Sequence, residues 1–193
     1  MAFSPDGHQM ATCGNDDHVR IWHFPWLNPT AEIIVPGATP GATSKEDKIE
    51  DAQFDAIDGN VLAIVTPSAV HVRDYAAARW VAKLEPLPGY AFRCARFTAP
   101  PGRKRASYLI TVENSKGKNY PILCLWRTDR WSRYSKTKMY TRLRVTTMGV
   151  SSNGRLVAIG SADGSVSVYD WRLYVRHCNN SFASLHLIPP LPL

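Results

Sequence analysis

The chain has 193 residues, of which 45% are hydrophobic and 20% charged, and it carries a net charge of +7. This is the balance of a folded globular protein and argues against wholesale disorder. Four cysteines spread widely through the chain argue against a disulfide-stapled scaffold, and the absence of any apolar run near roughly 18 residues predicts a soluble chain.

A strand–turn–strand–turn–strand pattern opens the chain. The first two predicted strands flank a turn at Asp6-Gly7, and a second turn at Asp16 leads into a strand that ends at Trp22. Asp-Gly favours a tight hairpin because glycine readily adopts the positive φ that such a turn requires. Trp22 is large enough to fill space between neighbouring sheets, and its polar edge can form a hydrogen bond.

The same pattern returns near the end of the chain. A turn at Asn153-Gly154 joins two apolar runs, and Asp163 precedes a third run that ends at Tyr169. Asp16 to Trp22 and Asp163 to Tyr169 have the same spacing, which indicates an internal repeat. We assign these four residues a structural role in building the repeat, and no role in chemistry.

Two weaker copies lie between these segments. One covers residues 49–84, with a turn at Asp58-Gly59, and the other covers 91–135, with longer loops at 100–106 and 114–119. Four units in a chain of this length give a number of residues per unit that is close to the roughly 40–45 residues of a WD repeat. The predicted fold is therefore an all-β WD-repeat β-propeller with about four blade units, at 1–27, 49–84, 91–135 and 143–177.

Both ends of the sequence depart from a closed ring. A propeller closes when its first and last blades meet, which removes open edges. Residues 178–193 are predicted to form an irregular tail, because Pro189, Pro190 and Pro192 cannot join a central strand. We therefore expect the four units to be part of a larger ring.

Charge is unevenly distributed along the chain. Twelve of the 23 basic residues lie between Arg103 and Arg144, opposed only by Glu113 and Asp129. We favour the interpretation that these basic residues lie in solvated loops. Two alternatives remain open: the basic tract could bind an anionic membrane surface, or it could bind a nucleic-acid backbone while the aromatic rings within the tract stack on bases. The candidate surface contacts are Arg103, Lys104 and Arg105, and the aromatic residues are Trp126, Trp131, Tyr134 and Tyr140.

An acidic cluster opposes this basic tract earlier in the chain. It is formed by Glu46, Asp47, Glu50, Asp51, Asp55 and Asp58. A solvated loop is again favoured over a docking site.

No catalytic motif is present, so no catalytic, cofactor-binding or metal-ligating residue is assigned. His18 and His23 lie near Asp16, but turn and surface positions explain them better than a metal site does. Cys13 and Cys94 lie in apolar runs, where buried thiols are mostly inert. We expect no cofactor and no small-molecule substrate.

The divergent third unit carries a more specific signal. Its segments at 90–97, 109–112 and 123–126 are followed by 145–151, 160–169 and 173–177, and residues 48–51 open the unit before it. In order and spacing, over roughly residues 1–177, this resembles the prolactin regulatory element-binding protein and its relatives. These are the endoplasmic-reticulum exchange factors that start COPII vesicle budding.

The resemblance implies a seven-bladed propeller on the cytosolic face of the endoplasmic reticulum membrane, held by a single anchor. It implies guanine-nucleotide exchange on the small GTPase that recruits the COPII coat. The family's glycine-rich, cation-binding exchange loop and its anchor have no counterpart in these residues, so no exchange residue is carried over. We expect weak exchange from this chain alone, and the alternative is a generic WD-repeat scaffold for another protein partner.

Overall fold

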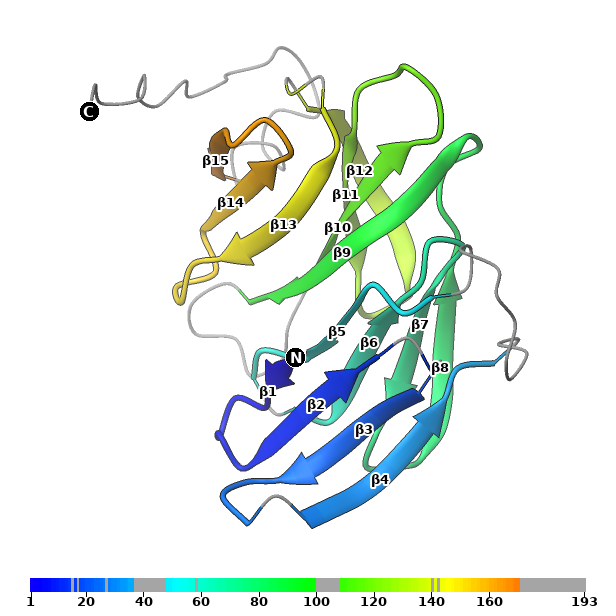
Figure 1. Ribbon diagram of the computed structural model, residues 1–193, viewed down its shortest axis with the longest axis vertical. Coiled ribbons are helices and arrows are strands. Elements are labelled where there is room, and N and C mark those ends of the chain that lie inside the picture. Colours follow the sequence, from blue (N-terminus) through cyan, green and yellow to red (C-terminus); the bar gives the residue numbers. More distant parts are fainter. Residues whose placement is uncertain are drawn as a thin grey trace.

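The computed structural model describes residues 1–14, 16, 18–26, 28–36, 48–57, 59–99, 108–139, 141 and 143–170. All regular elements among them are β-strands, which form four antiparallel sheets (Figure 1). Within each sheet the strands lie in chain order. The predicted all-β fold is therefore confirmed, and we call the sheets blades 1 to 4.

Each blade is a simple meander. Blade 1 contains β1 (Ala2–Phe3), β2 (Gln9–Cys13), β3 (His18–His23) and β4 (Asn28–Ile34). Blade 2 contains β5 (Asp51–Phe54), β6 (Val61–Val65), β7 (Val70–Asp74) and β8 (Arg79–Leu84). Blade 3 contains β9 (Tyr90–Thr98), β10 (Tyr108–Ser115), β11 (Ile122–Arg127) and β12 (Ser132–Lys138). Blade 4 contains β13 (Val145–Val150), β14 (Leu156–Ser161) and β15 (Val166–Asp170).

Strand β4 follows the range 1–27 that the sequence assigned to the first unit. It carries Pro29, which is compatible with its place at the sheet edge. The predicted strand at 173–177 and the tail 178–193 lie outside the described residues.

The hairpin turns have the backbone conformation that their sequences predict. Gly7, Gly154 and Gly164 have φ values of +72°, +65° and +81°. This is the left-handed region, which glycine adopts without steric cost. The prediction of tight turns at the Asp-Gly and Asn-Gly pairs is therefore confirmed at these positions.

Apolar side chains alternate between the two faces of the inner blades. In β6, Leu62 and Ile64 pack toward blade 1, whereas Ala63 and Val65 pack toward blade 3. All four are fully buried. A strand covered on both faces reads as a continuous apolar run, which is why β6 lacks the alternation of a half-exposed strand.

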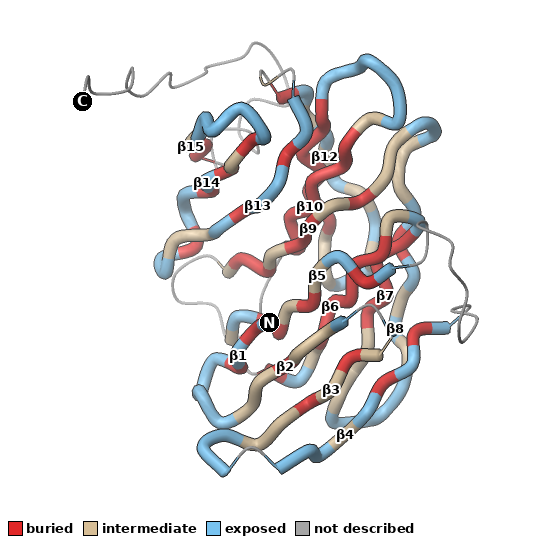
Figure 2. Tube along the Cα trace, in the orientation of Figure 1, coloured by how far each residue is buried: buried red, intermediate tan, exposed pale blue. Residues whose placement is uncertain are grey.

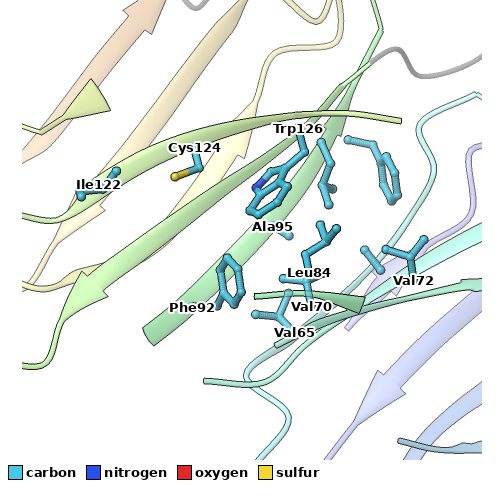
Figure 3. Packing of buried hydrophobic residues seen from close by; sticks show 12 residues of the cluster. Val65, Val70, Val72, Leu84, Phe92, Ala95, Ile122, Cys124 and Trp126 are labelled. Atoms are coloured by element: carbon cyan, nitrogen blue, oxygen red, sulfur yellow. The ribbon is translucent and has the colours of Figure 1, made fainter. Parts of the chain in front are cut away.

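Three hydrophobic clusters join successive blades. The cluster between blades 2 and 3 places Phe92 and Trp126 opposite Leu84 and Val70 (Figure 3). Equivalent clusters lie between blades 1 and 2 and between blades 3 and 4. Buried stretches run through the strands, and exposed stretches are prominent at the connecting turns (Figure 2). The core is thus divided into layers between blades.

The first strands of the blades lie next to one another at the hub. Strand β5 contacts β1 and β9, and β9 in turn contacts β13. The later strands lie progressively farther from this hub, with β4, β8 and β12 at the sheet edges. The result is a fan of blades whose two end members, blades 1 and 4, lie at opposite ends (Figure 1).

Candidate protein-interaction surfaces

The two repeat aspartates occupy equivalent turns. Asp16 precedes β3 and accepts a hydrogen bond from Arg20 Nη1 at 2.6 Å, and this contact lowers the pKa of its carboxyl group. Asp163 precedes β15 and accepts from Ser165 Oγ at 2.6 Å and from Ser165 N at 2.9 Å, which likewise lowers its pKa. Both aspartates are exposed, so each holds its own turn rather than a shared site.

The two closing aromatic residues differ in their surroundings. Tyr169 is buried in the cluster between blades 3 and 4, as expected for a residue that fills space between sheets. Trp22 is half-buried on the side of blade 1 that faces away from blade 2. Its Nε1 donates to Thr12 Oγ1 at 2.8 Å. Among the described residues, no second sheet covers the ring of Trp22.

A polar cluster in blade 3 was not identified from the sequence. Glu113 is fully buried; its Oε1 accepts from Arg133 Nη2 at 3.0 Å and its Oε2 accepts from Leu87 N at 2.8 Å. The Arg133 guanidinium also lies over the Trp126 ring, 4.4 Å from its centroid, and donates to Glu85 O. Both contacts outside blade 3 fall in the linker after β8, so this cluster ties blade 2 to blade 3.

Two residues of the predicted acidic cluster form ion pairs at the hub instead of lying in a solvated loop. Glu50 pairs with Arg93, and Asp51 pairs with Arg96, so both pairs join blade 2 to β9. Arg93 Nε also donates to Thr146 O at 3.2 Å, which reaches blade 4. Asp55 is buried, and Glu46, Asp47 and Asp58 lie outside the described residues.

The described part of the basic tract forms a positive surface on blade 3. Its exposed members on blade 3 are Lys116, Lys118, Arg130, Lys136 and Lys138, and exposed Arg144 lies just before β13 of blade 4. Glu113 is buried against Arg133 and Asp129 pairs with Arg127, so both carboxylates of the tract already contact arginine. Arg103, Lys104 and Arg105 lie outside the described residues. The exposed lysines and arginines therefore make this part of blade 3 positively charged.

Two of the aromatic residues proposed to stack on bases are engaged elsewhere. Trp126 is buried between blades, and its Nε1 donates to Thr111 Oγ1 at 2.9 Å. Trp131 packs edge-on against Phe97, with ring centroids 6.5 Å apart. Tyr134 remains exposed, and Tyr140 lies outside the described residues. Packing between blades therefore removes two of the four rings from any stacking platform.

The cysteines and histidines form no reactive constellation in the part of the chain that the structure describes. Burial raises the pKa of the Cys94 thiol to about 12 and also raises that of Cys124. No group of three potential metal ligands occurs among the described side chains. His18 Nδ1 contacts Asp16 O, and His23 stacks with His8 at 6.4 Å. No helix in the described segments could span a membrane.

Comparison with family models bears on both ends of this arrangement. The model described as WD domain, G-beta repeat matches residues 1–23 and 137–170, which contain most of blade 1 and all described strands of blade 4. The fold is a propeller-like arrangement of WD repeats. A search of curated proteins finds no match. WD repeats of blades 1 and 4 thus flank blades 2 and 3, whose sequences diverge from the repeat but fold in the same way.

Proposed function

We propose that these WD repeats bind the small GTPase of the COPII coat, as part of a guanine-nucleotide exchange factor in transport from the endoplasmic reticulum. The observation that carries the proposal is the resemblance of the divergent blades 2 and 3, in segment order and spacing, to the exchange factors named above. Blade 3 combines long strands with the polar cluster of Glu113 and Arg133. A generic scaffold needs no such departure from the repeat.

Nucleotide exchange requires differential affinity and no covalent chemistry. A partner that binds the nucleotide-free GTPase more tightly than the loaded form must, by linkage, weaken nucleotide binding. A rigid surface suits this role because it does not rearrange to fit the loaded form. The interlocked clusters between blades and the contacts of Arg93 with blades 2 and 4 provide such rigidity.

The basic surface of blade 3 supports a location next to an anionic membrane. Juxtamembrane basic residues contribute about 1 kcal/mol each near anionic lipid. Lys136 and Lys138 are exposed on β12, at the edge of the sheet. Lys83 has an equivalent exposed position on β8 and provides a matched control outside the basic tract.

The test is binding of this chain to the purified GTPase in nucleotide-free and GDP-loaded forms, by biolayer interferometry. We expect preferential binding of the nucleotide-free form, with little acceleration of GDP release because the family's exchange loop is not matched here. Equal affinity for the two forms, or no binding, would leave only the generic scaffold. In a parallel assay, Lys136→Glu with Lys138→Glu should weaken binding to anionic vesicles, and Lys83→Glu should not.

A further inference from the structure

The loop between β10 and β11 lies beside the segment that joins β12 to β13, at the upper end of the molecule in Figure 1. We call this surface the blade 3–4 rim and define it by five exposed residues. They are Lys116, Lys118 and Tyr120 in the loop, and Leu143 and Arg144 just before β13. Figure 2 shows the loop as an exposed stretch. The rim thus combines three cations with an aromatic and an aliphatic side chain.

The side chain of Asn114 holds the two parts of the rim together. Its Oδ1 accepts a hydrogen bond from Val145 N at 2.9 Å, and its Nδ2 donates to Val145 O at 3.0 Å. Both residues are buried, and the carboxamide takes the place of a peptide group of a neighbouring strand, although Asn114 belongs to blade 3 and Val145 to blade 4. Lys116 follows Asn114 by two positions and Arg144 immediately precedes Val145. These hydrogen bonds therefore bring cations of two blades to one surface.

Further hydrogen bonds fix the backbone of the loop. Lys116 N donates to Gly89 O at 2.9 Å, which ties the start of the loop to the linker before β9. Met139 N donates to Pro121 O at 2.9 Å, which ties the end of the loop to the segment after β12. Both Pro121 and Met139 are buried. Binding at a backbone that is already held in place costs less conformational entropy than ordering a loose loop.

Carboxylates near the rim do not balance its positive charge. Glu113 is buried against an arginine, and Glu50 pairs with another arginine at the hub. Asp163 is exposed in the turn of blade 4 beside Arg144, where it accepts hydrogen bonds from Ser165. Exposed Asp163 offsets one of the three cations, so the rim keeps a net positive charge and attracts an anionic partner.

The apolar members of the rim narrow the class of partner. Tyr120 is 38% exposed and Leu143 is 47% exposed. Tyrosine and arginine are enriched at protein–protein interfaces, where surrounding charges set the register. Two aromatic rings of the basic tract, those of Trp126 and Trp131, pack between blades and are not available to stack on bases. A protein segment with both carboxylates and apolar side chains therefore fits the rim better than a nucleic acid does.

We propose that the blade 3–4 rim binds a segment of a partner protein that carries both acidic and apolar residues. The carboxylates of the segment pair with Lys116, Lys118 and Arg144. Its apolar side chains cover Tyr120 and Leu143. This proposal is independent of the exchange-factor assignment, and its test uses a peptide instead of the GTPase, so failure of either test leaves the other standing.

The test is fluorescence anisotropy of a labelled peptide, in which glutamate alternates with leucine, titrated with the full chain at about 0.15 M ionic strength. The matched probe has glutamine in place of each glutamate. We expect the chain to bind the acidic peptide at least about tenfold more tightly than the glutamine peptide. We also expect the affinity for the acidic peptide to fall as salt is added, because salt screens exposed charges.

A pair of charge reversals tests the cations of the rim. Lys118→Glu with Arg144→Glu changes one residue in each blade and should raise the Kd for the acidic peptide at least about tenfold, because like charges then face each other. Lys83→Glu with Arg130→Glu makes the same change of charge at exposed positions outside the rim. This control should change the Kd less than about twofold, since distant charges are screened.

Tyr120→Ala tests the apolar part of the rim without changing its charge. It should raise the Kd at least about fivefold, whereas Tyr134→Ala, at an exposed tyrosine on β12, should not. Circular dichroism melting curves show whether each variant is folded.

Three results would overturn the proposal. The first is a parent chain that does not bind the acidic peptide or binds the glutamine peptide equally well. The second is a Kd that either rim variant leaves unchanged. The third is a parent chain that ignores the peptide but binds vesicles containing phosphatidylserine, with Lys118→Glu and Arg144→Glu together abolishing that binding, because the rim would then be a membrane contact.

Discussion

The Glu113–Arg133 pair offers the sharpest test of how blades 2 and 3 are joined. Replacing Glu113 by alanine leaves Arg133 and the N–H of Leu87 without their shared acceptor. Replacing Arg133 by alanine leaves a fully buried carboxylate without its counter-charge. Removing one partner of a buried pair costs about 3–5 kcal/mol. Because 23% of the Arg133 side chain is exposed, we expect Arg133→Ala to cost more than Glu113→Ala.

Equilibrium urea unfolding and thermal melting measure this loss. For a chain of this size, about 3–5 kcal/mol corresponds to a fall in Tm of roughly 6–20 °C. Arg127→Ala is the matched control, because Arg127 and its partner Asp129 lie at the surface and the melting curve should not move. Glu113→Met combined with Arg133→Met should recover part of the loss, since an apolar pair leaves no buried charge. Single variants that lose less than about 1 kcal/mol would refute the reasoning.

Three further predictions concern packing and burial. Gly164→Ala should lower the free energy of unfolding in urea by roughly 1–2 kcal/mol, and Gly154→Ala should lower it by at least twice as much. Both glycines have positive φ, but of the two only Gly154 would place the new Cβ 2.3 Å from a backbone oxygen. Thr111→Val should cost about 1–3 kcal/mol by stranding a buried indole N–H, and Thr12→Val should cost less because water can reach its half-buried indole; equal losses would contradict this. Cys94, with its pKa raised to about 12 by burial, should resist a thiol reagent at pH 8 until urea unfolds the chain, as peptide mass spectrometry would show.

The repeat was accessible from the sequence because its turns have strict chemical requirements. Asp-Gly and Asn-Gly pairs restrict the backbone at the turn itself, so Gly7, Gly154 and Gly164 could be assigned without knowledge of any neighbour. The strand β4 gave no such signal. It is a mostly exposed edge strand that contains Pro29, and its place in blade 1 depends on pairing with β3.

The candidate surfaces were harder to predict, because they depend on which distant residues meet. Trp126 and Trp131 have the same sequence context as exposed Tyr134, since all three follow or precede basic residues. Trp126 is buried in the cluster between blades 2 and 3, and half-buried Trp131 packs against the same cluster, to which blade 2 contributes residues more than 40 positions earlier in the chain. Likewise, a buried glutamate such as Glu113 cannot be distinguished from a surface one until its partners Arg133 and Leu87 are in place.

The sequence alone does not show which face of each blade packs against the next blade. A period of two assigns Ile21 and Trp22 of β3 to opposite faces of blade 1, but it does not say which face meets the next blade. In all three observed interfaces, the equivalent face of the earlier blade packs against the later blade. Once this orientation is known, exposed Phe3 and Val166 can be placed on the faces of blades 1 and 4 that point away from the neighbouring described blade, because the opposite faces pack in the clusters between blades.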